Sequence, residues 1–328
     1  MSVVAVAGGL GDMGRLITEA LFQTGKYEVY VISRKMPEGF PTRTSPLTGK
    51  SYLPLLQTDY KSEAEVTTLL ERHNVHTVIC TFSLDFDAPS NSQLNLIRAA
   101  DRASCVKRFI PSEFNVDYDL GDDVLPYPDK RFHAVARREL EKTALEFTYI
   151  YPGMFMDYFG MPNISTHLRE LCVIIDPTNG IAAVPGDGTA KMAMSFTKDV
   201  AKYTVLALEL EAWPRVMTTV SSTMSLNDLV AFTEKTLGRK LKVVYQPISV
   251  LRNHENMVLP RNIPIAEHFP EGLEQLKALT ADLEASIGLG AYDFDNLPEH
   301  LNLVEHFAEK TSAPMRIEEM IETGWKGS

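Results

Sequence analysis

The 328-residue sequence has few of the features that mark secreted, membrane-spanning or nucleic-acid-binding proteins. It has only three cysteines, Cys80, Cys105 and Cys172, and their wide spacing fits neither a disulfide framework nor a zinc site. No apolar run approaches the roughly 20 residues that cross a bilayer, and the N-terminus lacks the charged segment and cleavage site of a signal peptide. Lysine and arginine (32) are outnumbered by aspartate and glutamate (43), which gives a net charge of −11 and disfavours nucleic acid and anionic membranes. We therefore expect a cytoplasmic protein with reduced thiols, no bound metal, and neither nucleic acid nor membrane as a partner.

The first fourteen residues contain the most informative local pattern. Residues 3–7 form a short apolar, β-branched run that is typical of a strand buried on both faces of a parallel sheet. Gly8, Gly11 and Gly14 follow it, and residues 15–23 then show the periodicity of an amphipathic helix. A strand, a glycine turn and a helix in this order predict a dinucleotide site, because the glycines let the backbone approach the pyrophosphate and the helix N-terminus attracts its charge. The expected phosphate-binding residues are Gly8, Leu10, Gly11, Asp12, Met13 and Gly14.

The end of the second expected strand indicates which dinucleotide is bound. An acidic residue at this place would bond the ribose hydroxyls of NAD, but the sequence reads Ser33, Arg34, Lys35. A guanidinium can donate two parallel hydrogen bonds to a 2′-phosphate and stack on adenine. Arg34 and Lys35 therefore favour NADP(H) as the cofactor.

Alternation of strands and helices continues through the N-terminal half and predicts a doubly wound parallel sheet. At the end of the fourth strand, Thr81, Phe82 and Ser83 fall where such folds line the cofactor. An acidic stretch with glycine and prolines, residues 119–129, reads as a surface loop at the mouth of the cleft. After the first, the expected strands are 27–33, 51–56, 75–81, 106–110 and 147–151, and the helices between them are 63–73, 92–103 and 129–143.

The strict alternation stops after residue 155, which predicts two unequal domains. We expect residues 1–155 to form a Rossmann-type dinucleotide-binding domain, and residues 156–328 to form mainly a smaller α+β substrate domain, with segments able to return to the sheet. The junction is rich in large apolar side chains, which suit a flat hydrophobic substrate but also any domain-junction core. These are Met154, Phe155, Met156, Tyr158, Phe159 and Met161.

Several separated segments resemble one protein family. They include the opening glycine motif, the Pro-Ser-Glu-Phe sequence at 111–114, the run 137–149, the run 151–159 and the ending at 301–321. Together they are similar to the NmrA-like, isoflavone-reductase-like branch of the atypical short-chain reductases, over nearly the whole chain. The resemblance implies an NADPH-dependent reductase of secondary metabolism. It also implies that Phe155 flanks the nicotinamide and that the wall containing Glu113 and Phe114 faces the cofactor, although Glu113 is equally well explained as a structural carboxylate.

The expected catalytic position departs from this family. The resemblance places a catalytic lysine four residues before the first arginine of an Arg-Arg pair, but counting back from Arg137 gives His133. The nearest lysine is Lys130, about one helical turn away. A tyrosine-based site also lacks its lysine, because Arg131 stands four positions after Tyr127. Either His133 supplies the proton, for which an imidazole is suited near neutral pH, or Lys130 reaches into the site, or hydride chemistry is lost.

Three functions follow from these alternatives. The first is an NADPH-dependent reductase of a small aromatic or polyketide-like metabolite, with His133 as acid/base and Glu113, Phe114, Met154, Tyr158 and Phe159 near the substrate. The second is a non-catalytic NADP sensor of the NmrA type that regulates a partner protein. The third is an isomerase or cyclase that uses His133 for proton transfer without redox chemistry. Under each of these, the sequence is compatible with a monomer or a homodimer.

Overall fold

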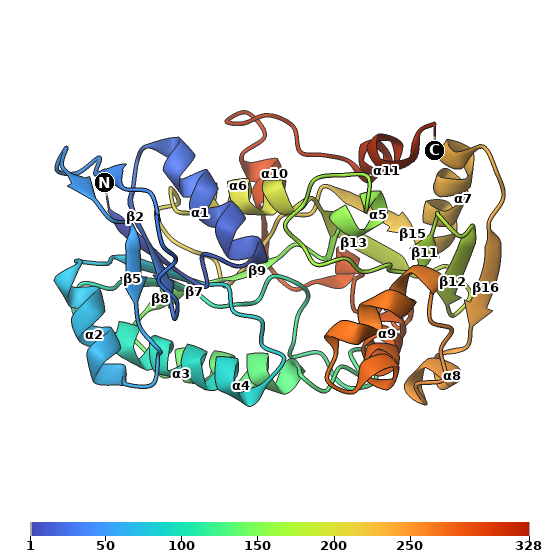
Figure 1. Cartoon of the computed structure of the whole chain (residues 1–328), viewed down its shortest axis with the longest axis horizontal. Helices are drawn as coiled ribbons and strands as arrows, with labels where there is room; N and C mark the ends of the chain where they lie inside the picture. The colour runs from blue at the N-terminus through green and yellow to red at the C-terminus, as the bar shows by residue number, and fades with distance from the viewer. Residues whose placement is uncertain (1, 328) are drawn as a thin grey trace.

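A six-stranded parallel sheet forms the N-terminal half of the computed structural model, which describes residues 2–327 (Figure 1). The strand order is β5-β2-β1-β6-β7-β8, and every neighbouring pair is parallel. In chain order this is 3-2-1-4-5-6, the arrangement of Rossmann-type folds, so the expected fold class is confirmed. The strands are β1 (Val3–Ala7), β2 (Glu28–Ser33), β5 (Leu55–Gln57), β6 (Thr77–Cys80), β7 (Arg108–Ile110) and β8 (Glu146–Phe147).

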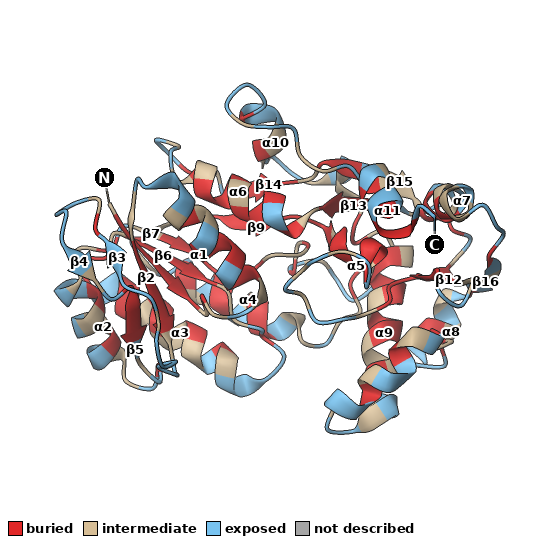
Figure 2. Cartoon of the chain, turned by 45° about the horizontal axis from the view of Figure 1, so that its top comes forward, coloured by how far each residue is buried: buried red, intermediate tan, exposed pale blue. Residues whose placement is uncertain are grey.

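Helices cover both faces of this sheet. Successive side chains of a strand point to opposite faces, and β1 is apolar throughout: Val4 and Val6 pack on one face, and Val3, Ala5 and Ala7 pack on the other. All five residues are buried, as Figure 2 shows for the central strands and the helix surfaces that face them. Burial on both faces explains the continuous apolar run in the sequence. One face carries α1 (Asp12–Thr24) and α6 (Thr197–Ala207), and the other carries α2 (Glu63–Arg72), α3 (Asp87–Arg102) and α4 (Lys130–Leu140).

The C-terminal half contains two small sheets with helices around them. One sheet has the order β10-β13-β15 and the other has the order β11-β12-β16. Among residues 2–327, no helix is both long and apolar enough to cross a membrane. The strands are β10 (Met154–Phe155), β11 (Ile175–Asp176), β12 (Ile181–Pro185), β13 (Lys191–Ser195), β15 (Ser222–Ser225) and β16 (Lys242–Gln246). The helices are α5 (Asp157–Gly160), α7 (Leu226–Leu237), α8 (Ile248–Arg252), η1 (Pro260–His268), α9 (Gly272–Gly288), η2 (Phe294–Asn296) and α11 (Ile317–Trp325).

Two C-terminal strands return to the N-terminal half. β14 (Val216–Thr218) pairs in parallel with β9 (Tyr149–Tyr151), which follows β8 directly in the chain. β17 (Leu301–Asn302) adds to the far side of β14 and leads into α10 (Leu303–His306). The C-terminal half is thus tied to the edge of the Rossmann-type sheet.

Most expected elements begin and end within three residues of the observed bounds, and three elements differ more. The strand expected at 51–56 is two pieces, because Pro54 has no N–H to continue a ladder: β4 (Ser51–Tyr52) pairs with β3 (Arg43–Thr44), and β5 joins the main sheet. The strand expected at 147–151 is divided at Thr148, where the backbone partner changes from residue 107 to residue 215. Helix α3 begins at Asp87 rather than at residue 92. The expected start lay after Pro89, but this proline is in the first turn of the helix, where a missing N–H breaks no helical hydrogen bond.

Candidate active site

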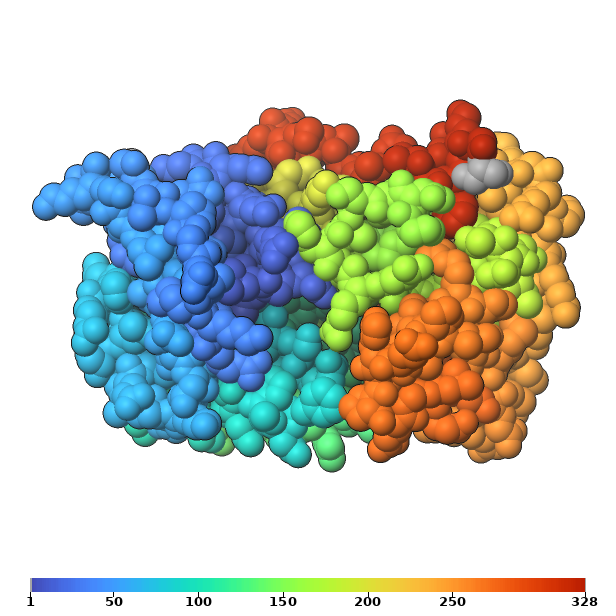
Figure 3. Space-filling model, viewed as in Figure 1, coloured from blue at the N-terminus to red at the C-terminus, as the bar shows by residue number. Residues whose placement is uncertain are grey.

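A cavity of about 870 Å³ lies at the carboxyl ends of β1, β2 and β6. Figure 3 shows it as a hollow between the blue N-terminal part and the yellow-green and orange C-terminal part. Ligands of open α/β sheets bind at this edge, where the strand order reverses. This volume is within the range of ligand pockets, at roughly 300–1,000 Å³.

The glycine loop forms the floor of one end of the pocket. Gly8 has a positive φ of 81°, and its carbonyl accepts a hydrogen bond from the Gly11 N–H at 2.9 Å. Gly11 is the N-cap of α1, and no side chain caps this helix, so its first N–H groups are free for an anion. A side chain at Gly14 would collide with the Gly8 carbonyl and the Thr81 hydroxyl, which explains why only glycine allows helix and strand to pack so closely here.

The second strand ends in two exposed cations at the same pocket. Arg34 and Lys35 both line it, beside Ser33, whose hydroxyl accepts a hydrogen bond from the Lys35 N–H at 3.1 Å. No carboxylate of the described residues pairs with either cation at ion-pair distance. Both charges are therefore available to an anionic ligand such as a 2′-phosphate.

The ends of β6 and β7 form the wall opposite the second strand. Thr81 donates a hydrogen bond to the Ala7 carbonyl at 2.9 Å, and Ser112 donates one to the Phe82 carbonyl at 2.7 Å. Phe82 packs edge-on against Tyr60 with ring centroids 5.0 Å apart. Thr81, Phe82 and Ser83 all line the pocket, where the sequence predicted them.

His133 lies on α4 and lines the same pocket. Its ring stacks on Tyr118 with centroids 3.5 Å apart and planes 10° apart, and only 8% of the residue is exposed. The Nδ1 atom is buried without a hydrogen-bond partner among the described residues. Burial, reinforced by the positive charge of Arg137, lowers the pKa of His133 to about 3. The imidazole is therefore neutral at physiological pH and is a proton acceptor or a neutral hydrogen-bond donor.

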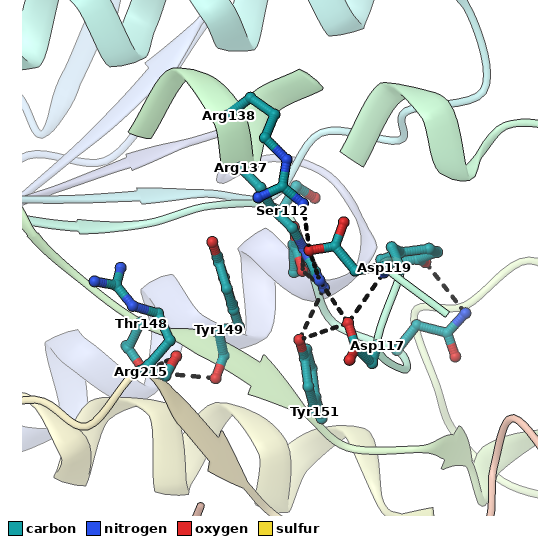
Figure 4. Close-up of polar contacts among 12 residues, drawn as sticks. Ser112, Asp117, Asp119, Arg137, Arg138, Thr148, Tyr149, Tyr151 and Arg215 are labelled. Atoms are coloured by element: carbon teal, nitrogen blue, oxygen red, sulfur yellow. Dashed lines mark hydrogen bonds and ion pairs between the residues drawn. The ribbon is translucent and has the colours of Figure 1, made fainter. Parts of the chain in front are cut away.

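A buried ionic cluster fixes α4 one turn after His133. Arg137 donates hydrogen bonds to both carboxylate oxygens of Glu113, at 2.8 and 3.0 Å from Nε, and to the Tyr151 hydroxyl at 2.8 Å. Asp117 and Asp119 pair with the same guanidinium at 2.5 and 3.1 Å (Figure 4). Burial raises the pKa of Glu113 to about 7 against the attraction of Arg137. Glu113 is fully buried and is not part of the pocket lining, so its contacts are structural.

Lys130 is on the same helix, but its ammonium points toward the 119–129 loop instead of the pocket. Its Nζ donates hydrogen bonds to the carbonyls of Leu120 at 2.7 Å and Leu125 at 3.0 Å, and pairs with Asp122 at 2.6 Å. Lys130 does not line the pocket. It holds the acidic 119–129 loop against α4.

The structure brings together most of the residues predicted for the site. Five predicted residues do not line the pocket. Of these, Gly14 in the first turn of α1, Met154 in β10 and Phe159 in α5 are buried. The Phe159 carbonyl accepts a hydrogen bond from the Trp325 indole at 2.7 Å. Glu113 and Lys130 have the structural contacts described above. The predicted residues that do line the pocket are Gly8, Leu10, Gly11, Asp12, Met13, Arg34, Lys35, Thr81, Phe82, Ser83, Phe114, His133, Phe155 and Tyr158.

Several residues that line the pocket were not predicted from the sequence, among them the charged or aromatic residues Asp85, Tyr118 and Arg169. Asp85 lies two residues after Ser83, so extending the predicted Thr81–Ser83 segment by two residues would have included it. Burial raises the pKa of its carboxyl group. Tyr118 and Arg169 stand in irregular segments with no periodic pattern, so no sequence signal marks them.

Comparison with known proteins identifies the family. Residues 1–301 match the model of the NmrA-like family. The chain is 33% identical over 237 residues to oxidoreductase BOA1 of Botryotinia fuckeliana, covering 72% of this chain and 76% of that protein. It is 28% identical over 278 residues to phenylcoumaran benzylic ether reductase TP7 of Nicotiana tabacum, covering 81% and 84%.

A solved structure supports the same fold. Leucoanthocyanidin reductase from Vitis vinifera, in a binary complex with NADPH, superimposes with a TM-score of 0.70 at 18% identity, covering 98% of each chain. The chain therefore belongs to the NmrA-like family, and its relatives in that family are oxidoreductases.

Proposed function

We propose that this oxidoreductase is an NADPH-dependent reductase of a small aromatic or polyketide-like metabolite. The observation that carries the proposal is that the glycine loop, Arg34 and His133 line one continuous pocket. The first two suit an anionic dinucleotide, and the third is a proton-transferring group within the same cavity. The NADPH complex of the related plant reductase supports the choice of cofactor.

The residues present fit NADP(H). The uncapped N-terminus of α1 would hold the pyrophosphate, and Arg34 with Lys35 would hold the 2′-phosphate. Phe155 would flank the nicotinamide, as the family resemblance implies. When bound, the cofactor supplies a hydride to an electron-poor carbon of the substrate.

In the reduction, the neutral His133 ring would take up a proton from water as negative charge develops on the substrate, and would pass that proton to the substrate oxygen. Negative charge that develops on a substrate oxygen beside the ring would raise the pKa of the imidazole, because an opposite charge nearby favours its protonated form. The Tyr118 stack holds the ring in place, and no competing hydrogen bond occupies Nδ1 within the described residues. Since the ring is buried, this charge interaction is less screened than it would be in water.

Aromatic side chains support a flat, apolar substrate. Phe114, Tyr118, Phe155 and Tyr158 line the same pocket as His133, and Tyr118 stacks on its ring. Rings such as these provide large apolar contact area with few flexible bonds. We propose that residues 1–155 hold the cofactor and that residues 156–328 mainly complete the substrate side, to which Tyr158, Leu168 and Arg169 contribute.

The test is steady-state NADPH consumption with a panel of enones, quinones and benzylic ethers. With an active substrate, we expect His133→Ala to lower turnover by about 10²–10⁴-fold with nearly unchanged NADPH affinity. Lys130→Ala is the control on the same helix and should keep its turnover, because Lys130 binds the 119–129 loop. A large loss from Lys130→Ala with none from His133→Ala would transfer the proton chemistry to Lys130.

A second candidate function is proton transfer without redox chemistry, as in an isomerase or cyclase. The specific observation in its favour is that His133 is neutral and has an unpaired Nδ1 among the described residues, which is the state of a general base. Product formation at constant NADPH absorbance would identify this function. Binding of NADPH with no turnover of any kind would favour a sensor.

A further inference from the structure

Three side chains that line the pocket carry a full positive charge, and one of them has no assigned role. Arg34 and Lys35 follow β2 and lie together at one end. Arg169 comes from the C-terminal half, in the irregular segment between α5 and β11. The same segment contributes Leu168 to the lining. The pocket thus has a cation on the wall that faces the glycine loop.

Arg169 reaches the glycine loop across the pocket. Its Nε lies 3.9 Å from the Asp12 carboxylate, in the first turn of α1. Figure 3 shows yellow-green atoms of this part of the chain against the dark-blue N-terminal region. The Arg169 side chain is 79% exposed and Asp12 is 41% exposed, so this ion pair contributes little by itself. The guanidinium therefore remains free to bind a ligand that carries more negative charge.

The segment is anchored on both sides of its tip. Before the tip, the Thr166 hydroxyl donates a hydrogen bond to Asp157 at 2.8 Å. After the tip, Glu170 pairs with Arg261 at 2.6 Å. Only three residues, 167–169, separate these anchors, which limits how far the Arg169 backbone can move away from the pocket.

We propose that Arg169 binds the pyrophosphate of the dinucleotide from the side opposite the glycine loop. This inference rests on the proposed function, since it takes NADP(H) as the ligand. The N-terminus of α1 places the pyrophosphate beside Asp12, which is the group that Arg169 already approaches. A planar guanidinium can donate two hydrogen bonds to phosphate oxygens, and the two negative charges of the pyrophosphate compete with the single charge of Asp12. Cofactor binding thereby includes a contact from the C-terminal half of the chain.

The test compares ligands with and without a pyrophosphate. NADPH and NADH both contain one, whereas adenosine 2′-monophosphate contains only the 2′-phosphate. Removing one charged hydrogen-bonding group costs on the order of tenfold in affinity, so we expect Arg169→Ala to weaken both dinucleotides by about tenfold. Affinity for adenosine 2′-monophosphate should stay unchanged. Arg169→Lys should retain part of the dinucleotide affinity, because the charge remains.

His167→Ala is the matched control, because His167 is an exposed neighbour on the same tip that does not line the pocket. It should leave all three affinities unchanged. Parent-like binding of NADPH by Arg169→Ala would overturn the Arg169 assignment while leaving the proposed function intact. An equal loss for adenosine 2′-monophosphate would also overturn it, since the contact would then be with the adenosine end. Failure of the parent protein to bind either dinucleotide would instead overturn the proposed function.

Discussion

At the scale of single residues, the state of His133 decides what chemistry is possible. The ring is buried against Tyr118, and it is one helical turn from the positive charge of Arg137. Both influences disfavour the imidazolium. A free histidine would be partly protonated near pH 6.5, but this one enters any reaction as the neutral ring.

The low pKa of His133 makes stability depend on pH in a defined direction. Between pH 6.5 and about 3, the unfolded chain protonates this histidine and the folded chain does not, so the free energy of unfolding falls as the pH is lowered through this range. At pH 5 the cost is about 2 kcal/mol relative to pH 8. Thermal unfolding at both pH values should show that His133→Asn loses less stability on acidification than the parent protein. His268→Asn, at an exposed position, should behave like the parent, and an identical acid response in all three proteins would contradict the buried neutral ring.

The Arg137 cluster should be the most sensitive ionic contact of this region. Removing Glu113 leaves the buried Arg137 Nε without its acceptor and only Asp117 and Asp119 to offset the charge, so we expect Glu113→Ala to lower the free energy of unfolding by about 3 kcal/mol. Arg138→Ala is the control, because its pairs with Asp119 and Glu141 are exposed and should cost no more than about 1 kcal/mol. Urea denaturation measures both. Similar costs for the two variants would show that the buried pair does not hold α4 in place.

At the scale of elements, Gly11 and Gly14 have different structural roles in the turn between β1 and α1. A Cβ at Gly14 would collide with the Gly8 carbonyl, so Gly14→Ala must separate α1 from β1 and should cost about 1–3 kcal/mol of stability. A Cβ at Gly11 meets only the Gly8 carbonyl, at 3.3 Å, so Gly11→Val should fold nearly normally. Its side chain would occupy the phosphate site, and NADPH binding should be lost. Thermal unfolding with NADPH titration separates these effects, and normal NADPH binding by Gly11→Val would show that the phosphate site is elsewhere.

The sequence predicted those helices and strands that are specified by their own residues. β1 and α1 were recognisable because burial on both faces leaves an apolar run and the glycine turn follows at once. β14 and β17 were not, because each has only two or three residues and its partner lies more than 60 residues away. Short strands of this kind are specified by tertiary pairing rather than by their own pattern.

At the scale of the whole molecule, the pocket is assembled from both halves of the chain. The dinucleotide side comes from strand ends that the sequence pattern located, and these residues were predicted. The opposite side comes from Tyr118, Tyr158 and Arg169, and two of these lie in irregular segments whose position depends on distant contacts. Lys130 was a candidate because helical spacing puts it near His133, but spacing does not show that carbonyls of a neighbouring loop already bind its ammonium.

The measurement that tests the cofactor assignment most directly is fluorescence titration of the parent protein and Arg34→Ala with NADPH and NADH. A charged, forked contact to the 2′-phosphate contributes roughly 1.5–3 kcal/mol, so the parent should bind NADPH about ten- to a hundredfold more tightly than NADH. Arg34→Ala should lose most of this preference, while Arg43→Ala, an exposed arginine outside the pocket, should keep it. Equal affinity of the parent protein for NADPH and NADH, or an unchanged preference in Arg34→Ala, would contradict the assignment of this pocket as an NADP(H) site.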